Sequence, residues 1–248
     1  MTEIAAIIFL SILSGMTTII GVALAMIFKK HTPAIAIGMG FSTGIMLLIS
    51  FFDLIPESLT SLNYLYVFGA VFLGAFVLAF ANYLIPHIHF FKEEGKLKSP
   101  LIKSAYLIAI GLILHDFPEG FAMANSYIYS PNLGIFVAAS IALHNIPEEF
   151  AIAAPFVVSG KGKRQSLFKA AFVSGLAEPA GALLGLIAVG MFSVLNPFFM
   201  SSAAGAMIFI SLHELIPLAN KYKNPHLFVL GMVTSVFIYM GLGAIFPN

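Results

Sequence analysis

The feature that most constrains this chain is a series of continuous apolar runs, each about 20 residues long and separated by polar turns. In a bilayer only helices and closed barrels satisfy every backbone hydrogen bond, and barrels show ten-residue alternating segments instead. The runs therefore predict an all-α polytopic membrane protein. We expect eight transmembrane helices, at Ile4–Phe28, Ala34–Leu54, Tyr64–Ile85, Leu101–Ser126, Leu133–Val158, Ser166–Phe192, Phe198–Leu218 and Leu227–Phe246.

Composition supports lipid as the solvent of this chain. Apolar residues make up 60% of it and charged residues 9%, whereas about a quarter of a soluble domain is charged. The chain has no cysteine, which excludes disulfides, thiolate metal ligands and a cysteine nucleophile. A net charge of +1 gives no sign of nucleic-acid binding. We expect the lipid bilayer and no nucleic acid as partners.

The basic residues orient the predicted bundle. All 12 fall in, or within one helical turn of, the connections between helices 1 and 2, 3 and 4, 5 and 6, or 7 and 8. By the positive-inside rule these four connections are cytoplasmic and both termini are extracytoplasmic. No linker divides the chain, so we expect one transporter domain over residues 1–248, with one short cytoplasmic loop at about 87–100.

Two internal repeats are visible. Residues 44–56 (G-x-M-x-x-x-S-x-x-D-L-I-P) correspond to 205–217 (G-x-M-x-x-x-S-x-x-E-L-I-P), and residues 115–122 (H-x-x-P-E-x-F-A) correspond to 144–151. The members of each pair lie an odd number of helices apart, so they cross the membrane in opposite senses. We predict an inverted repeat of 3+2+3 helices, with helices 1–4 matching helices 5–8 in reversed order. Transporters with such repeats bind substrate near the midplane.

Ionisable residues inside a membrane cost about 2.5–3.5 kcal/mol each on insertion scales, so they indicate function. No basic residue accompanies those of this chain, and neighbouring carboxylates repel unless a cation neutralises them. A bound metal ion is the natural solution. The membrane-embedded set is His115, Asp116, Glu119, His144, Glu148, Glu149, Glu178, His213 and Glu214.

The spacing of the two H-x-x-P-E motifs indicates chelation. Residues i and i+4 share a helix face, so His115 with Glu119 and His144 with Glu148 each form a two-toothed ligand pair. Two imidazoles and two carboxylates suit Zn²⁺ and also accept Fe²⁺, Mn²⁺ or Co²⁺. The proline of each motif frees a backbone carbonyl and kinks its helix.

Neighbours of these pairs extend the candidate site. Asp116 and Asn145 point about 100° round their helices from the histidines, toward an adjacent second site. Glu178, followed by proline, repeats the acid-plus-proline pattern on helix 6. Glu149 has no counterpart in helix 4, where Gly120 stands, and the sequence assigns it no role.

Other residues have two readings each. Met46 is a soft ligand or a packing residue. The ionisable residues near the helix ends either bind metal at the two mouths of a transport path or cap their helices. They are Asp53 and Glu57 near the outer end and His213 and Glu214 near the inner end. Ser211 favours an interhelical hydrogen bond. His87 and His89 hold metal on exit or lie at the membrane interface.

With these residues the sequence resembles the ZIP (Zrt/Irt-like) family of divalent metal transporters, and most closely its bacterial zinc-uptake branch. The resemblance covers essentially the whole chain and includes Glu-Pro-x-Gly at 178–181 and Ser-x-His-Glu at 211–214. It implies uptake of Zn²⁺ as substrate, and of Fe²⁺, Mn²⁺, Co²⁺ or Cd²⁺, across a prokaryotic plasma membrane. It also implies a homodimer and alternating access, with helices 1, 4, 5 and 6 moving against 2, 3, 7 and 8.

The resemblance further implies a binuclear midplane centre. One metal ion is expected on Met46, His115, Glu119, His144 and Glu148. The other is expected on Asp116, Asn145 and Glu178, with Glu119 and Glu148 bridging. Two positions depart from the family pattern: Asp116 stands where Asn is common, and Glu149 stands where Gly is usual, which bears on helix packing there.

Three other functions are compatible with a membrane metal site. A metal exporter shares its chemistry. An intramembrane zinc-dependent hydrolase typically carries His-Glu-x-x-His beside an open metal position, which this chain lacks. A metal-sensing receptor requires a signalling domain. We therefore expect a transporter and not an enzyme.

Overall fold

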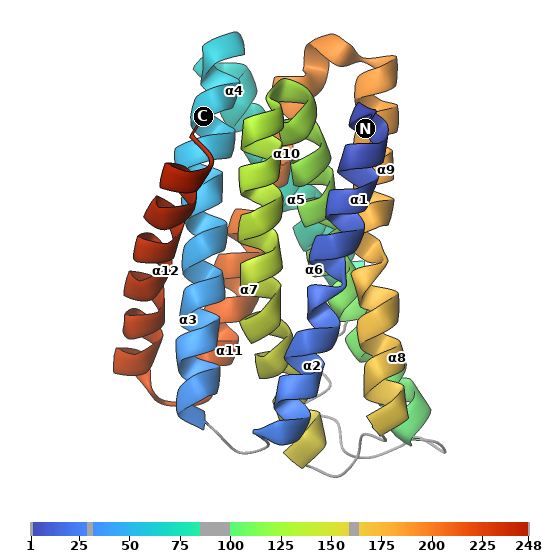
Figure 1. Ribbon diagram of the computed structural model, residues 1–248, viewed down its shortest axis with the longest axis vertical. Helices are drawn as coiled ribbons and strands as arrows, with labels where there is room; N and C mark the ends of the chain where they lie inside the picture. Colours follow the sequence, from blue (N-terminus) through green and yellow to red (C-terminus); the bar gives the residue numbers. More distant parts are fainter. Residues whose placement is uncertain (1, 29–31, 85–99, 159–163, 248) are drawn as a thin grey trace.

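The fold is known from a computed structural model that describes residues 2–28, 32–84, 100–158 and 164–247, without the side chains of 100–112, 155–156, 158, 164 and 166. The described residues form helices and turns and contain no strand. They group into eight rods (Figure 1). In chain order the rods are α1 (Glu3–Gly15) with α2 (Thr17–Ile27); α3 (Thr32–Leu48), η1 (Ile49–Leu54) and α4 (Ile55–Ser61); α5 (Tyr64–Leu84); α6 (Pro100–Tyr129); α7 (Pro131–Val158); α8 (Arg164–Gly175) with α9 (Ala177–Met191); η3 (Ser193–Leu195), α10 (Asn196–Ile210), η4 (Ser211–Leu215) and α11 (Ile216–Asn220); and α12 (Pro225–Ile245).

The eight rods agree with the predicted eight helices. Seven helical segments among the described residues are long and apolar enough to cross a membrane. The eighth rod, α6, has 30 residues and therefore also exceeds the length that a bilayer requires. Both chain ends lie at the same end of the bundle (Figure 1), as an even number of crossings demands. The predicted all-α polytopic membrane fold is confirmed.

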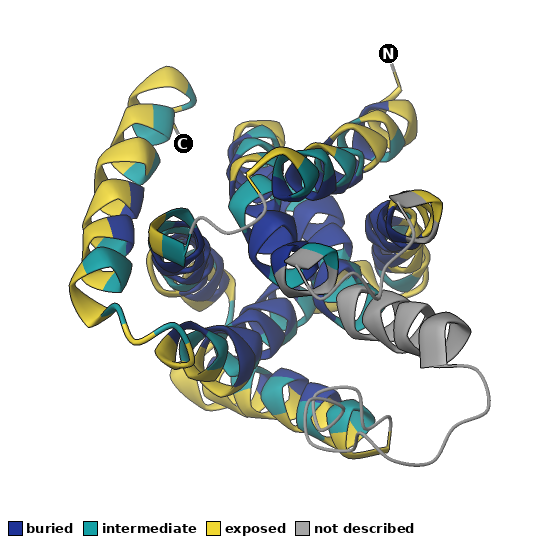
Figure 2. Cartoon of the chain, turned by 90° about the horizontal axis from the view of Figure 1, so that it is seen from below, coloured by how far each residue is buried: buried dark blue, intermediate teal, exposed yellow. Residues whose placement is uncertain are grey.

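Burial separates an inner group of helices from a lipid-facing shell. The rods at the centre of the bundle are dark blue in Figure 2, whereas α12 at its edge is mostly yellow. Large apolar side chains on the outer helices are open to the surroundings, as with Phe72 of α5 at 76% and Phe237 of α12 at 68%. In a bilayer such side chains meet lipid tails. The polar side chains turn inward instead, because lipid offers them no hydrogen bonds.

Four rods are interrupted, those of helices 1, 2, 6 and 7, whereas the prolines of the sequence predicted kinks in helices 4 and 5. α1 gives way to α2 at Met16, and α8 to α9 at Leu176. Helices 2 and 7 widen into the π-helical segments η1 and η4, each ending two residues before a proline. Helix 2 therefore runs on to Ser61 rather than ending at Leu54. π-Helical segments are common at functional sites.

The helix contacts correct the predicted order of the repeat. α3 packs on α12 as α10 packs on α5, and α7 packs on α2 as α6 packs on α9. Helices 1, 2 and 3 therefore match helices 6, 7 and 8 in the same order, with helices 4 and 5 as a central pair. The reversed matching of helix 1 with helix 8 is wrong, because helix 8 packs mainly on helix 2, whereas helix 1 packs on helices 5 and 6.

Two glycines mark where the halves of the repeat meet. A Cβ on Gly15 would lie 2.2 Å from the Gly175 carbonyl oxygen, and one on Gly175 would lie 2.4 Å from the Gly15 oxygen. This reciprocal contact is what a twofold relation between helices 1 and 6 produces. Only glycine lets two backbones approach so closely.

Candidate metal centre

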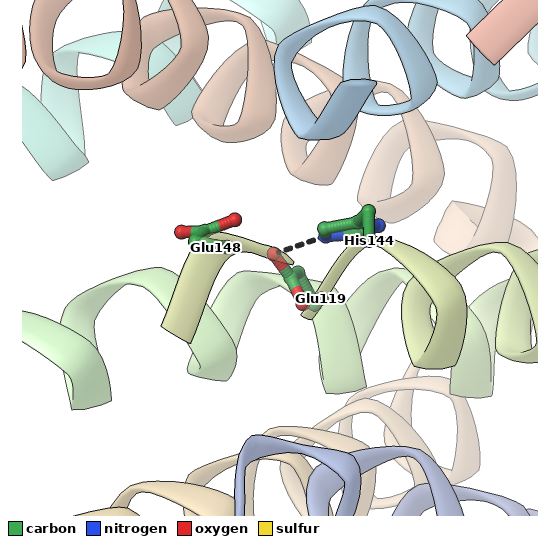
Figure 3. Close-up of side chains that lie close together, drawn as sticks. All are labelled: Glu119, His144 and Glu148. Carbon is green, nitrogen blue, oxygen red and sulfur yellow. Dashed lines mark hydrogen bonds and ion pairs between the residues drawn. The ribbon is translucent and has the colours of Figure 1, made fainter. Parts of the chain in front are cut away.

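Glu119 of α6 and two residues of α7, His144 and Glu148, form the tightest group of candidate ligands. One ligand atom from each lies within 4.8 Å of the others, and all three residues are buried. His144 and Glu148 stand one turn apart on α7, and Glu119 reaches toward them from α6 (Figure 3). His144 Nε2 lies 3.1 Å from Glu119 Oε1. The i and i+4 spacing in the sequence predicted this pairing of faces.

His115 repeats the arrangement from the other helix. Its Nδ1 lies 3.2 Å from Glu148 Oε1, so each histidine contacts the glutamate of the opposite helix. Its Nε2 contacts Glu214 Oε2 of η4. Glu214 therefore lies at the centre, although the sequence placed it near an end of the path. Its other oxygen accepts a hydrogen bond from Asn82 Nδ2 of α5 at 2.9 Å.

A second group of polar residues flanks the histidine pair. Asn145 Nδ2 donates to Glu178 Oε1 at 2.6 Å, and the other Glu178 oxygen accepts from Ser14 Oγ. Asp116 Oδ2 accepts a hydrogen bond from Ser174 Oγ. The three residues predicted for a second site are all buried, and helices 4, 5 and 6 each supply one of them.

Close backbone packing holds these helices in place. Ideal Cβ atoms on Gly120 and Gly181 would lie 1.9 Å from the Glu178 oxygen and 2.1 Å from the Phe117 oxygen, so α6 and α9 touch through their main chains. On α7, Ser42 of α3 donates to the His144 carbonyl at 2.8 Å. Ligands carried by packed helices keep their spacing better than ligands on loops.

The carboxylates of this region have spare hydrogen-bonding capacity. Glu119 Oε2, Glu148 Oε2 and Glu149 Oε2 are buried atoms without a hydrogen-bond partner. Among the side chains that the structure describes, no lysine or arginine is buried. Buried carboxylates need hydrogen bonds or a counter-charge, so the chemistry of this region suits a bound cation.

The remaining candidates of helix 2 have other surroundings. Met46 is fully buried, and its Sδ lies 3.8 Å from Ser211 Oγ, an interhelical contact. Asp53 Oδ2 accepts a hydrogen bond from Tyr239 at 2.7 Å. Glu57 lies half-buried on α4.

One further candidate histidine, His213, does not share the buried setting of these groups. His213 is exposed and stacks on Phe209 with ring centroids 4.8 Å apart. His87 and His89 lie outside the described residues.

Sequence reasoning missed Ser14 and Ser174, which support Glu178 and Asp116. A signal was present, because each serine precedes a glycine and a helix break in matching positions of helices 1 and 6. It also missed Asn82 and Tyr239. Single polar residues on otherwise apolar helices carry no pattern that distinguishes them.

Comparisons with known proteins agree with this geometry. The family described as ZIP zinc transporter matches residues 91–246. The chain is 38% identical to the zinc transporter ZupT of Corynebacterium aurimucosum, over 92% of each chain. It is 35% identical to the ZupT of Streptococcus mutans and 34% identical to that of Chlorobaculum parvum, in each case over 92% of this chain and 93% of the relative.

Proposed function

This chain belongs to the ZIP zinc transporter family, and we propose that it takes up divalent transition metal ions into the cytoplasm, with Zn²⁺ as the main substrate. The family and the relatives support a multi-pass membrane protein that transports metal and is not an enzyme. Fe²⁺, Mn²⁺, Co²⁺ and Cd²⁺ share enough ligand chemistry with Zn²⁺ to be further substrates.

The observation that carries the proposal is the buried group of Glu119, His144 and Glu148, with ligand atoms within 4.8 Å of one another. Imidazole and carboxylate are ligands that Zn²⁺ accepts in fourfold coordination. Because the group is assembled from two helices related by the inverted repeat, it stands where such transporters bind their substrate.

We assign two metal positions to this centre. The first uses Met46, His115, Glu119, His144 and Glu148, and the second uses Asp116, Asn145 and Glu178. Glu119 and Glu148 bridge the two, which the free second oxygen of each carboxylate supports. Asp116 adds a negative charge to the second position, so that position favours a divalent over a monovalent cation.

The helix packing supports a division into two moving groups. α1, α2, α6, α7, α8 and α9 pack on one another, and α3, α5, α10 and α12 form a second group. The groups meet where α3 contacts α7 and α10 contacts α6, beside the metal ligands. Sliding of one group against the other would open the centre to each side in turn. The metal ion then contacts Asp53 and Glu214, which lie on the two π-helical segments, along its transport path.

The membrane orientation and the oligomeric state remain predictions. Both termini lie outside the cell, with the basic loops in the cytoplasm, on the strength of the positive-inside rule. The protein is expected to form a homodimer, which light scattering of the purified protein in detergent tests directly.

The transport proposal is tested with purified protein in liposomes that contain a zinc-sensitive dye. External Zn²⁺ is expected to raise the internal signal for the wild type and much less for the double variant His115→Ala, Glu148→Ala. Equal influx for the two proteins, both shown to be folded and inserted, would refute the proposal. Efflux from preloaded liposomes under the opposite gradient, compared with influx, separates uptake from export.

A further inference from the structure

Glu149 is a buried carboxylate of α7 to which the binuclear assignment gives no role. It is 2% exposed, and its Oε2 has no hydrogen-bond partner. Leaving such a group buried without compensation costs several kcal/mol. Its position therefore calls for an explanation in terms of what it binds.

The spacing on α7 places Glu149 with the second group of ligands. Asn145 and Glu149 are four residues apart, as are His144 and Glu148, so α7 carries two neighbouring ligand pairs. Asn145 Nδ2 already contacts Glu178. On α6 the corresponding residues are Asp116 and Gly120. Only α7 therefore carries an oxygen-bearing side chain at both positions of the second pair.

Helix packing explains why the two helices differ. A side chain at Gly120 would collide with the α9 backbone, since its Cβ would lie 1.9 Å from the Glu178 oxygen. At Glu149 the facing residue is Gly21 of α2, and a Cβ on Gly21 would lie 2.6 Å from the Glu149 Cβ. The space that close packing requires is provided by glycine on α2, which leaves α7 free to carry a carboxylate.

The opposite directions of α6 and α7 place Glu149 and Asp116 on the same side of the bridging glutamates along the bundle. α6 and α7 run antiparallel through the bundle (Figure 1), Asp116 precedes Glu119, and Glu149 follows Glu148. Both residues therefore lie on the same side of the bridging glutamates, toward the end of the bundle opposite the termini.

We propose that Glu149 is a further ligand residue of the second metal position, beside Asp116, Asn145 and Glu178, and that it makes this position selective for hard divalent cations such as Mn²⁺. This inference rests on the proposed function. All four side chains offer oxygen, which hard cations prefer, whereas the first position offers imidazole nitrogen and thioether sulfur. The added carboxylate supplies the charge that a divalent ion neutralises.

The test measures Mn²⁺ and Zn²⁺ binding to the purified full-length protein in detergent, with Mn²⁺ followed by electron paramagnetic resonance. Glu149→Gln is expected to weaken Mn²⁺ binding at least about tenfold and to leave tight Zn²⁺ binding at the first position nearly unchanged. Glu3→Gln, which removes an exposed carboxylate on α1, is the matched control and is expected to bind both ions as the wild type does.

A second variant separates a ligand from a neutral packing residue. Glu149→Asp keeps the charge and changes the shape, whereas Glu149→Gln keeps the shape and removes the charge. If Glu149 is a ligand, Glu149→Asp retains more Mn²⁺ affinity than Glu149→Gln. If Glu149 only packs, Glu149→Gln is the more thermally stable of the two variants, and both bind Mn²⁺ as the wild type does. Wild-type Mn²⁺ affinity in Glu149→Gln would overturn the inference. Absence of transport by the wild type would refute the proposed function, and the binding comparison would still decide the role of Glu149.

Discussion

Each histidine of the centre holds the glutamate of the opposite helix. His144 contacts Glu119 at 3.1 Å and His115 contacts Glu148 at 3.2 Å. These contacts set the imidazole orientations and keep the carboxylates close to the axis between α6 and α7. In the proposed centre an arriving metal ion would take over these contacts, because the same nitrogen and oxygen atoms would be its ligands. The protein therefore keeps its ligands ordered before the ion binds.

Met46 provides a prediction at the same scale. Its thioether is a soft ligand, and Met46→Leu preserves side-chain volume in a fully buried position. We expect the variant to fold normally and to lose Cd²⁺ influx more than Mn²⁺ influx. Influx of both ions into liposomes under identical gradients measures the ratio. An unchanged ratio would mean that Met46 only packs.

The grouping of the candidate ligand residues was predictable from the sequence because their geometry is local. Four residues separate histidine from glutamate on one helix, and that spacing fixes a shared face whatever the rest of the chain does. The placement of Glu214 was not predictable in this way. The π-helical segment η4 changes the phase of the helix, so that Glu214 is buried against His115 while neighbouring His213 faces outward.

At the scale of elements, glycine determines which helices can touch. Gly15 and Gly175 meet backbone to backbone, next to Ser14 and Ser174, whose hydroxyls contact Glu178 and Asp116. Movement of these two helices apart would therefore withdraw both serines from the proposed second metal position. Helix existence was readable from apolar length, but the breaks were not, because they follow from contacts between helices distant in sequence.

The glycine contact predicts a stability difference between two Gly→Ala variants. Gly175→Ala places a Cβ 2.4 Å from the Gly15 oxygen, whereas the same change at Gly190 meets nothing within 4 Å. We expect Gly175→Ala to lower the thermal unfolding midpoint. We expect Gly190→Ala to leave it unchanged or raise it, since alanine favours helix over glycine by about 1 kcal/mol.

Circular dichroism of the detergent-purified variants at 222 nm gives both midpoints. Equal midpoints for Gly175→Ala and Gly190→Ala would show that helices 1 and 6 are not in backbone contact.

At the scale of the whole molecule, the inverted repeat explains why similar motifs recur with opposite direction. Helices 1–3 and 6–8 form equivalent halves around the central pair α6 and α7. The repeat itself was visible in the sequence. Its order was not, because helices 1 and 6 share little beyond one Ser-Gly pair, and the helix packing with the contact between Gly15 and Gly175 reveals the match.

The absence of cysteine makes the membrane orientation directly testable. Ser61 ends α4, Lys223 lies in the turn between α11 and α12, and both are exposed. These two segments lie at opposite ends of the bundle (Figure 1). In intact cells, a membrane-impermeant maleimide is expected to label Ser61→Cys and to leave Lys223→Cys unlabelled until the cells are lysed. The opposite pattern would place both termini in the cytoplasm and reverse the proposed path.

The central claim is that residues from two inverted helices hold one and the same ion during transport. Its most direct test is the initial rate of Zn²⁺ influx into liposomes for wild type, His144→Ala, Glu119→Gln and the double variant. A shared ion predicts that each single change removes most of the rate and that the double variant is little slower than either. Losses that multiply in the double variant, as they do for independent sites, would contradict the claim.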